Sequence, residues 1–224
     1  MEEIIQKAID RGQKVLSEYD SKRVISSAGI PVNREKLART REEAVSFAGS
    51  IGYPVALKGC SDKAAHKTEM GLVKLKLGNA DEVAKAYDEI LAKGVELDGV
   101  LVGEMVKGDR EFVLGLMRDP QFGPCVMFGI GGIFTEAIKD VTFRVAPITE
   151  LDAEEMIDEI RLAKLLSAFR GNPAVDRKAL VRALVSIGDL GYRCENIAEI
   201  DINPVIIAGD QPVAVDALVV LKPC

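Results

Sequence analysis

This chain of 224 residues has a single histidine and no closely spaced cysteines, which limits the catalytic and metal-binding chemistry that it can perform. The chain has one histidine, His66, so any chemistry that needs an imidazole is confined to that residue. Its four cysteines, Cys60, Cys125, Cys194 and Cys224, form no C-x-x-C pair and have no histidine at ligand spacing. These spacings argue against a zinc site and favour free buried thiols in a reducing cytoplasm.

Excess positive charge and long apolar runs are also lacking. The 29 lysine and arginine residues are outnumbered by 35 aspartate and glutamate residues, which gives a formal net charge of −6. This balance argues against a nucleic-acid surface, which needs clustered cations, but it leaves room for a small pocket that binds a phosphorylated ligand. No apolar run approaches the roughly 20 residues that span a bilayer, and the first residues show no signal peptide. We therefore expect a cytoplasmic protein with no nucleic-acid or membrane partner.

The residues that are present suit a folded protein of mixed helices and strands. Apolar residues make up 48% of the chain and charged residues 29%, which is enough for a buried core. Helix and strand patterns alternate up to about residue 98, whereas strand patterns follow in quick succession from residue 100, as in an antiparallel sheet. We expect an α/β (α+β) fold of two lobes that clamp one ligand. Residues 1–98 would form an N-terminal helix and a small α/β lobe, and residues 99–224 a larger lobe that ends in a hairpin.

Three local patterns predict particular elements. Alternation over residues 72–77 predicts a strand with Val73, Leu75 and Leu77 on one face and the two lysines on the other. Apolar residues over 133–138 predict another strand. Apolar spacing predicts one helix from near Asp152 to about Gly171, with inward-facing residues Met156, Ile157, Ile160 and Leu166.

The C-terminal hairpin carries a candidate metal site. Glu199, Asp201 and Asn203 alternate with isoleucines, so their oxygen-bearing side chains share one face of a strand. If Gly209-Asp210 is a two-residue turn, residues equidistant from it stand opposite each other, which pairs Asn203 with Asp216. An amide oxygen and a carboxylate suit Mg²⁺, which is usually held by few protein ligands together with substrate phosphates. The alternative is that these are solvated polar positions on a sheet with one exposed face.

Lys58 is a candidate phosphate ligand. It lies at the end of the predicted strand that begins at Pro54, and a loop follows it. A lysine at a strand end can reach ligand phosphates as a point charge. An edge lysine that faces solvent fits the same pattern.

The loop over residues 61–71 contains the sole histidine. It combines small residues, lysines, a threonine and a glycine, a composition that suits a flexible lid over phosphates. A neutral imidazole is a competent phosphoryl nucleophile, although a lone histidine is more often a surface or structural residue. A second glycine-rich segment, Phe128 to Phe134, precedes a strand pattern rather than a helix, so it does not meet the requirement of a dinucleotide-binding fingerprint. It favours a tight turn or close approach of the backbone to a ligand or partner.

Taken together, these segments resemble a known family. It is the ATP-grasp β subunit of ADP-forming acyl-CoA synthetases, which is related to the nucleotide-binding part of succinyl-CoA synthetase. The resemblance covers nearly the whole chain. Its carriers are, in order, residues 53–58 (YPVALK), 65–71 (AHKTEMG), 102–106 (VGEMV), 110–112 (REF), 118–124 (RDPQFGP), 129–132 (GIGG), 139–140 (KD), 169–171 (FRG) and 201–204 (DINP).

The resemblance implies an ATP-grasp fold and a role for each matching residue. Lys58 would bind nucleotide phosphates, and Glu104, with Met105 and Val106, would lie near the adenine and ribose of ATP or ADP. Glu111 would lie in the same cleft. Asn203 and Asp216 match the Mg²⁺ positions, with Asp201 a weaker candidate ligand. His66 matches a histidine that the family phosphorylates transiently. Leu72 departs from the pattern, since many members have a second glycine after Gly71.

The resemblance also implies a reaction and a partner. An acid–thiol ligase of the ADP-forming acetate–CoA type converts an acyl-CoA, ADP and phosphate into the free acid, CoA and ATP. A CoA-binding α subunit would form the acyl phosphate in an α2β2 heterotetramer, and His66 would carry the phosphoryl group to ADP. Two alternatives stay open: another ATP-grasp carboxylate ligase without a phosphohistidine, and a non-catalytic module that senses nucleotides.

Overall fold

The computed structural model describes residues 1–61, 70–132, 140–168 and 171–222, and it divides the chain into two compact units. Unit 1 comprises Met1–Leu16, Asp20–Val32 and Val106–Cys224, and unit 2 comprises Ser17–Tyr19 and Asn33–Met105. Each unit is built on its own sheet, and all pairs between named strands are antiparallel. The expected mixed α/β fold with antiparallel sheets is confirmed.

Unit 2 has a four-stranded sheet with helices on one face. The strands are β1 (Glu35–Ala38), β2 (Val55–Cys60), β3 (Val73–Leu77) and β4 (Gly99–Glu104), in the spatial order β1-β4-β2-β3. Helices α3 (Arg41–Ile51) and α4 (Ala80–Leu91) begin where Thr40 and Asn79 accept hydrogen bonds from backbone N–H groups three residues on. The core between helices and sheet consists mainly of Val55, Leu57, Leu72, Val83, Ile90, Val100 and Val102.

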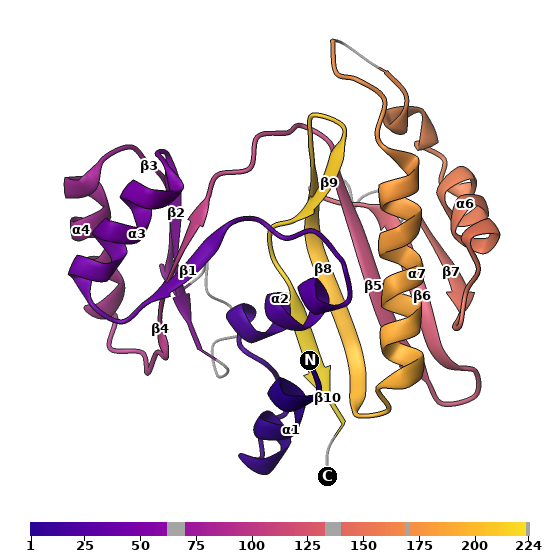
Figure 1. Ribbon diagram of the computed structural model, residues 1–224, viewed down its shortest axis with the longest axis horizontal. Coiled ribbons are helices and arrows are strands. Elements are labelled where there is room, and N and C mark those ends of the chain that lie inside the picture. The colour runs from indigo at the N-terminus through magenta and orange to yellow at the C-terminus, as the bar shows by residue number, and fades with distance from the viewer. Residues whose placement is uncertain (62–69, 133–139, 169–170, 223–224) are drawn as a thin grey trace. The chain divides into compact units, whose positions relative to one another are not determined.

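Unit 1 has a six-stranded sheet. Its strands are β5 (Glu111–Asp119), β6 (Gly123–Ile130), β7 (Val141–Val145), β8 (Ile197–Ala208), β9 (Gln211–Ala214) and β10 (Leu218–Leu221). The spatial order is β10-β8-β5-β6-β7, and β9 pairs with β8. The helical elements are α1 (Glu2–Asp10), α2 (Glu18–Ser27), α6 (Glu150–Glu159), the 3-10 turn η1 (Ala163–Leu166) and α7 (Arg177–Arg193). Figure 1 shows α7 lying along β5 and β6, with α6 beside it.

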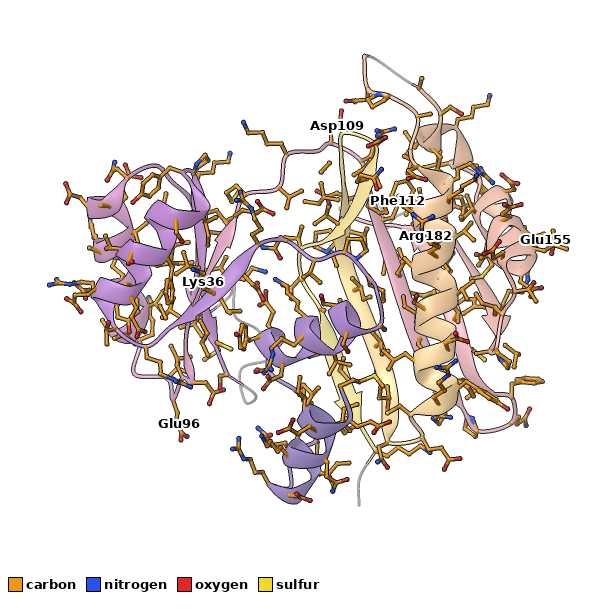
Figure 2. The ribbon with its side chains drawn as sticks, in the orientation of Figure 1. Lys36, Glu96, Asp109, Phe112, Glu155 and Arg182 are labelled. Carbon is orange, nitrogen blue, oxygen red and sulfur yellow. The ribbon has the colours of Figure 1, made fainter. Side chains whose placement is uncertain are left out.

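Alternation along β5 separates the two faces of the larger sheet. Phe112, Leu114 and Leu116 are buried in the core that the helices cover, whereas Val113 and Met117 belong to the opposite face. Phe112, labelled in Figure 2, stacks on Phe128 of β6 with ring centroids 5.6 Å apart. The face without these core residues is the one on which the candidate metal ligands lie.

The division into units differs from the expected division after residue 98. Strand β4 begins at Gly99 but pairs with β1 and β2, so it belongs to the smaller sheet. Helix α1 and most of α2, expected with the small lobe, belong to unit 1. A run such as Val100 to Val102 has the same pattern in either sheet, because strand pairing is set by partners distant in sequence.

One predicted strand face and one predicted helix end are wrong. A register shift on β3, where Lys76 has a positive φ of 61°, places an extra residue opposite β2. Leu77 therefore pairs with Val55, while Leu75, predicted on the same face, is 55% exposed. The helix predicted to continue to residue 171 ends at Glu159, because the Asp140 carboxylate accepts hydrogen bonds from the backbone N–H groups of Arg161 and Leu162.

Two further differences concern the middle of the chain. The strand β7 was not predicted, because its short segment Val141–Val145 mixes apolar, hydroxyl and charged side chains. The strand predicted over residues 133–138 lies outside the described residues. None of the described helices is long and apolar enough to cross a membrane.

Candidate functional site

Lys58, the candidate phosphate ligand, is held by a buried carboxylate. Its Nζ atom lies 2.7 Å from Oε1 of Glu18, the first residue of α2. The Glu18 side chain is 1% exposed and the Lys58 side chain 15% exposed. Both residues belong to unit 2. The alternative of an edge lysine that faces solvent is therefore excluded, since the ammonium group is largely buried and paired.

Strand geometry explains why Lys58 points away from the helices of unit 2. Its neighbours Leu57 and Val55 lie in the core against α3 and α4, so Lys58 belongs to the opposite face of β2. On that face it stands across from Leu101 of β4 and Val73 of β3. Burying an ammonium group is costly, and the carboxylate of Glu18 compensates that cost.

Glu104 occupies the last position of β4, where the chain leaves the smaller sheet. Its side chain accepts hydrogen bonds from the backbone N–H of Arg34, at 2.9 Å, and from Arg34 Nε, at 2.7 Å. Its backbone N–H donates to the Arg34 carbonyl at 2.9 Å. The residues predicted beside it divide between the units, with Met105 in unit 2 and Val106 in unit 1. The carboxylate of Glu104 is thus fixed by Arg34 at the point where the chain passes from one unit to the other.

Glu111, at the start of β5, lies against the glycine-rich segment. The Gly131 N–H donates to the Glu111 carbonyl at 2.8 Å. A Cβ atom on Gly131 would lie 2.8 Å from the Phe112 backbone, and one on Gly132, whose φ is +68°, would lie 2.6 Å from Glu111 Oε2. The glycines therefore allow close approach of the backbone to the strand that carries Glu111, whereas the expected approach to a ligand or partner stays a prediction.

The C-terminal hairpin has the predicted register. The pairs from Ala208–Gln211 to Val205–Ala214 are equidistant from the Gly209-Asp210 turn, and the pairs Asp201–Leu218 and Ile200–Val219 keep the same spacing. Residues 215–217 interrupt the second strand, and within this interval the Val215 N–H donates to the Pro204 carbonyl at 3.0 Å. Asn203 and Asp216 thus occupy equidistant positions between two segments that share one register.

A bulge in β8 sets Asn203 apart from the regular pairing. The register between β5 and β8 shifts between Leu114, which pairs with Ile202, and Phe112, which pairs with Val205. Asn203 and Pro204 therefore stand opposite the single residue Val113. Asn203 is exposed, whereas Ile202 and Val205 on either side are buried. Such a bulge directs a side chain away from the core, as a ligand position requires.

Negative charge gathers on this face of the larger sheet. The pKa of Asp201 is raised to about 6, first by burial and then by the charges of Glu199 and Asp216. A cavity of about 360 Å³ on the same face is lined by Glu199, Asp201 and Asn203 together with apolar residues of β5, β6 and β7. A cation here would relieve the repulsion that raises the pKa of Asp201.

The donor set fits Mg²⁺ better than a metal held by protein ligands alone. The described residues contain no cluster of three or more histidine, cysteine, aspartate or glutamate side chains that could hold a metal ion. Asn203 and Asp216 offer one amide oxygen and one carboxylate, which leaves positions for water and phosphate oxygens. The half-buried Asp201 is close enough to Asp216 for the charge of Asp216 to raise its pKa.

The structure gathers the predicted residues into two groups. Glu111, Asp201, Asn203 and Asp216 belong to the larger sheet and its hairpin in unit 1, and Lys58 and Glu104 lie on adjacent strands of unit 2. His66 lies outside the described residues. Sequence reasoning missed Glu18 as the partner of Lys58. No local signal marks it, because Lys58 is 40 residues away.

Comparison with known proteins identifies the family of the chain. The ATP-grasp domain model matches residues 7–221. The β subunit of acetate–CoA ligase [ADP-forming] I from Pyrococcus furiosus is 44% identical, over 98% of this chain and 97% of that protein. Acetate–CoA ligase [ADP-forming] I from Archaeoglobus fulgidus is 39% identical over 98% of this chain, but the match spans only 33% of that longer protein.

Solved structures also match the chain over nearly its whole length. Dinucleotide-forming acetyl-coenzyme A synthetase 1 from Ca. Korarchaeum cryptofilum, in complex with coenzyme A and Ca-AMPCP, matches with a TM-score of 0.93 and 46% identity, over 98% of this chain and 99% of that one. A second structure of that enzyme holds coenzyme A and Mg-AMPPCP, with its phosphohistidine segment pointing towards the nucleotide-binding site. It matches with a TM-score of 0.88 and 46% identity, over the same shares of both chains. Because the ATP-grasp domain model and a β subunit of 44% identity both match nearly the whole chain, this chain belongs to the ATP-grasp domain family.

Proposed function

We propose that this chain is the nucleotide-binding β subunit of an ADP-forming acyl-CoA synthetase of the acetate–CoA ligase type. The reaction converts an acyl-CoA, ADP and phosphate into the free acid, CoA and ATP. The observation that carries the proposal is the match over nearly the full length of both chains to a β subunit of that activity. The paired Lys58 and the oxygen ligands of the C-terminal hairpin support it, because a phosphoryl transfer to ADP needs both kinds of group.

Each site residue has a proposed role in this reaction. Lys58 donates hydrogen bonds to the nucleotide phosphates, and Glu104 lies near the adenine and ribose, followed by Met105 and Val106. Glu111 contributes to the same nucleotide site. Asn203 and Asp216, with Asp201 as a weaker ligand, hold Mg²⁺, which when bound offsets negative charge on the phosphates.

His66 is the proposed phosphoryl carrier. It accepts the phosphoryl group from a CoA-binding α subunit and passes it to ADP, so that the group is not lost to water between two separate sites. The α subunit is proposed because the relative from Archaeoglobus fulgidus is about three times longer than the matched region, whereas the β subunit from Pyrococcus furiosus has almost the same extent as this chain. An α2β2 heterotetramer is the assembly we propose.

Phosphorylation by ATP tests this proposal with the full chain. Incubation with Mg²⁺ and γ-labelled ATP should give a label that is lost in acid and kept in base, as a phosphohistidine requires. Because His66 is the only histidine, such a label can lie nowhere else, and His66→Asn should abolish it. An unchanged label in that variant would contradict the carrier role. An ATP-grasp ligase without a phosphohistidine would bind ATP and take no such label, and a nucleotide sensor would bind it without any transfer.

The partner and the acyl group need a second experiment. The complex that co-purifies with the tagged chain should form ATP from ADP and phosphate when supplied with an acyl-CoA, and a panel of acyl-CoAs identifies the group used. The chain without its partner should show none of this overall activity, since CoA chemistry is assigned to the α subunit.

A further inference from the structure

We propose that Glu18 is a positioning residue for phosphoryl transfer, which fixes the ammonium group of Lys58 in the orientation that contacts the nucleotide phosphates. The inference rests on the proposed function, because it takes Lys58 as a phosphate ligand. It adds a residue that no motif in the sequence pointed to and that lies 40 positions before the lysine it serves.

Glu18 and Lys58 form a short, buried ion pair. The distance from Lys58 Nζ to Glu18 Oε1 is 2.7 Å, and both side chains are largely withdrawn from solvent. Lys58 is fixed at its base by the β2 backbone, which pairs with β3 and β4 on either side. Glu18 comes from the first turn of a helix, so the lysine is held at both ends by different elements of secondary structure.

The pair leaves Lys58 able to bind a phosphate. An ammonium group has three N–H donors, so a lysine can donate to a carboxylate and to a phosphate oxygen at the same time. Its charge stays compensated when the site is empty, which a buried cation requires. When phosphates bind, an ammonium group held by Glu18 already has its direction fixed, so that little orientation is lost during the transfer. Protein kinases use a similar pair, in which a helix glutamate holds the strand lysine that contacts the nucleotide phosphates.

The same unit contains a matched pair that should have no such role. Lys74 on β3 forms an ion pair with Glu89 on α4, again a strand lysine with a helix glutamate. Their side chains are 32% and 43% exposed, and Lys74 pairs across the sheet with Leu57, a residue on the helix-covered face. Glu89→Gln is therefore the control, because it also removes a helix glutamate that pairs with a strand lysine, but on the other face of the sheet.

The test is a double-mutant cycle on the rate of phosphoryl transfer from Mg-ATP to the full chain. Glu18→Gln, Lys58→Met and the double variant are compared with the natural chain and with Glu89→Gln. We expect Glu18→Gln to slow the transfer at saturating ATP at least tenfold while the dissociation constant of ADP changes less than about threefold. In Glu18→Gln, the poorer orientation of the Lys58 ammonium weakens ADP binding, but the loss of the carboxylate that repels the ADP phosphates strengthens it. These two effects oppose each other in the dissociation constant, whereas the rate depends on the orientation alone.

The cycle separates positioning from general support of the fold. In the Lys58→Met background, Glu18→Gln should produce no further loss of rate, because there is no ammonium left to orient. Glu89→Gln should leave the rate unchanged. Thermal melting identifies any unfolded variant. If Glu18→Gln does not fold, Glu18→Asp keeps the charge but is one methylene shorter, and it should slow the transfer to an intermediate degree.

The outcomes that overturn the inference differ from those that overturn the proposed function. If Lys58→Met slows the transfer but Glu18→Gln does not, Glu18 has no positioning role and the proposed function stands. Equal effects of Glu18→Gln in both backgrounds would also exclude action through Lys58. If the natural chain takes no label, or if Lys58→Met leaves the rate unchanged, the phosphate role of Lys58 fails and the inference falls with it.

Discussion

In the four-stranded sheet, Lys58 faces away from the helices, and a buried glutamate 2.7 Å away compensates its charge. In the six-stranded sheet, the corresponding face carries acidic groups, and the pKa of Asp201 is raised by burial and by like charges on Glu199 and Asp216. One site is therefore balanced by the protein itself, while the other accumulates negative charge. An ammonium paired with a carboxylate can bind an anion and clustered carboxylates favour a cation, which is the chemistry that the proposed roles of Lys58 and of the hairpin residues require.

The largest effect should come from removing the oxygen ligands of the larger sheet. Asn203→Ala and Asp216→Ala should each slow phosphoryl transfer from Mg-ATP about 100-fold or more, because the transferring charge loses its stabilisation. The measurement is the labelling rate as a function of Mg²⁺ concentration. Glu154→Ala, on the exposed surface of α6, is the control. If transfer is as fast in either hairpin variant as in the natural chain, that residue is not a metal ligand.

Removing one charge of the Glu18–Lys58 ion pair should change the stability of the fold most clearly. Glu18→Gln leaves a largely buried ammonium without its carboxylate, so the free energy of unfolding should fall by about 3 kcal/mol in denaturant titrations. Replacing both Glu18 and Lys58 by uncharged residues should recover much of this loss. A single variant as stable as the natural chain would mean that the pair contributes little to the fold.

Lys58→Met should weaken the binding of ADP about tenfold, since a charge-assisted hydrogen bond to phosphate contributes about 1.5–3 kcal/mol. Calorimetric titration with Mg-ADP gives the dissociation constant. Lys74→Met supplies the matched control, because Lys74 is a strand lysine of the same sheet paired with Glu89 on its helix-covered side. Similar losses in the two variants would show that the effect is not specific to the buried lysine.

The raised pKa of Asp201 should make the stability of the fold depend on pH. The pKa of Asp201 in the folded chain, about 6, lies above the ordinary value of about 3.9, so the folded state binds more protons between these values. Its contribution to stability is therefore present at low pH and is lost as pH rises through 6. Asp201→Asn should be more stable than the natural chain by about 1 kcal/mol at pH 8, after allowance for solvent screening, and equally stable near pH 4.

Unfolding curves at the two pH values provide this measurement, and added Mg²⁺ should reduce the difference at pH 8. Glu89→Gln should give the smallest change, about 0.5 kcal/mol or less at any pH, because Lys74 and Glu89 are partly exposed. A difference for Asp201→Asn that is the same at pH 4 and pH 8 would show that the charge is not responsible.

The sequence by itself determined those features that depend on short-range pattern. Thr40, Asn79 and Asp176 are the N-caps of their helices because a side-chain oxygen can reach an N–H three residues on. The C-terminal turn fixed the register that makes Asn203 and Asp216 equidistant from it. Motif order along the chain pointed to the ATP-grasp family, with which the comparisons agree.

Only the tertiary structure decided which distant groups meet. Three features each depend on a contact between separate segments. They are the ion pair of Glu18 with Lys58, the place of Gly99–Glu104 in the smaller sheet, and the end of α6 next to the carboxylate of Asp140. No local pattern encodes such contacts, because burying a charge or a free N–H is costly wherever it occurs, and the fold selects which partner compensates it.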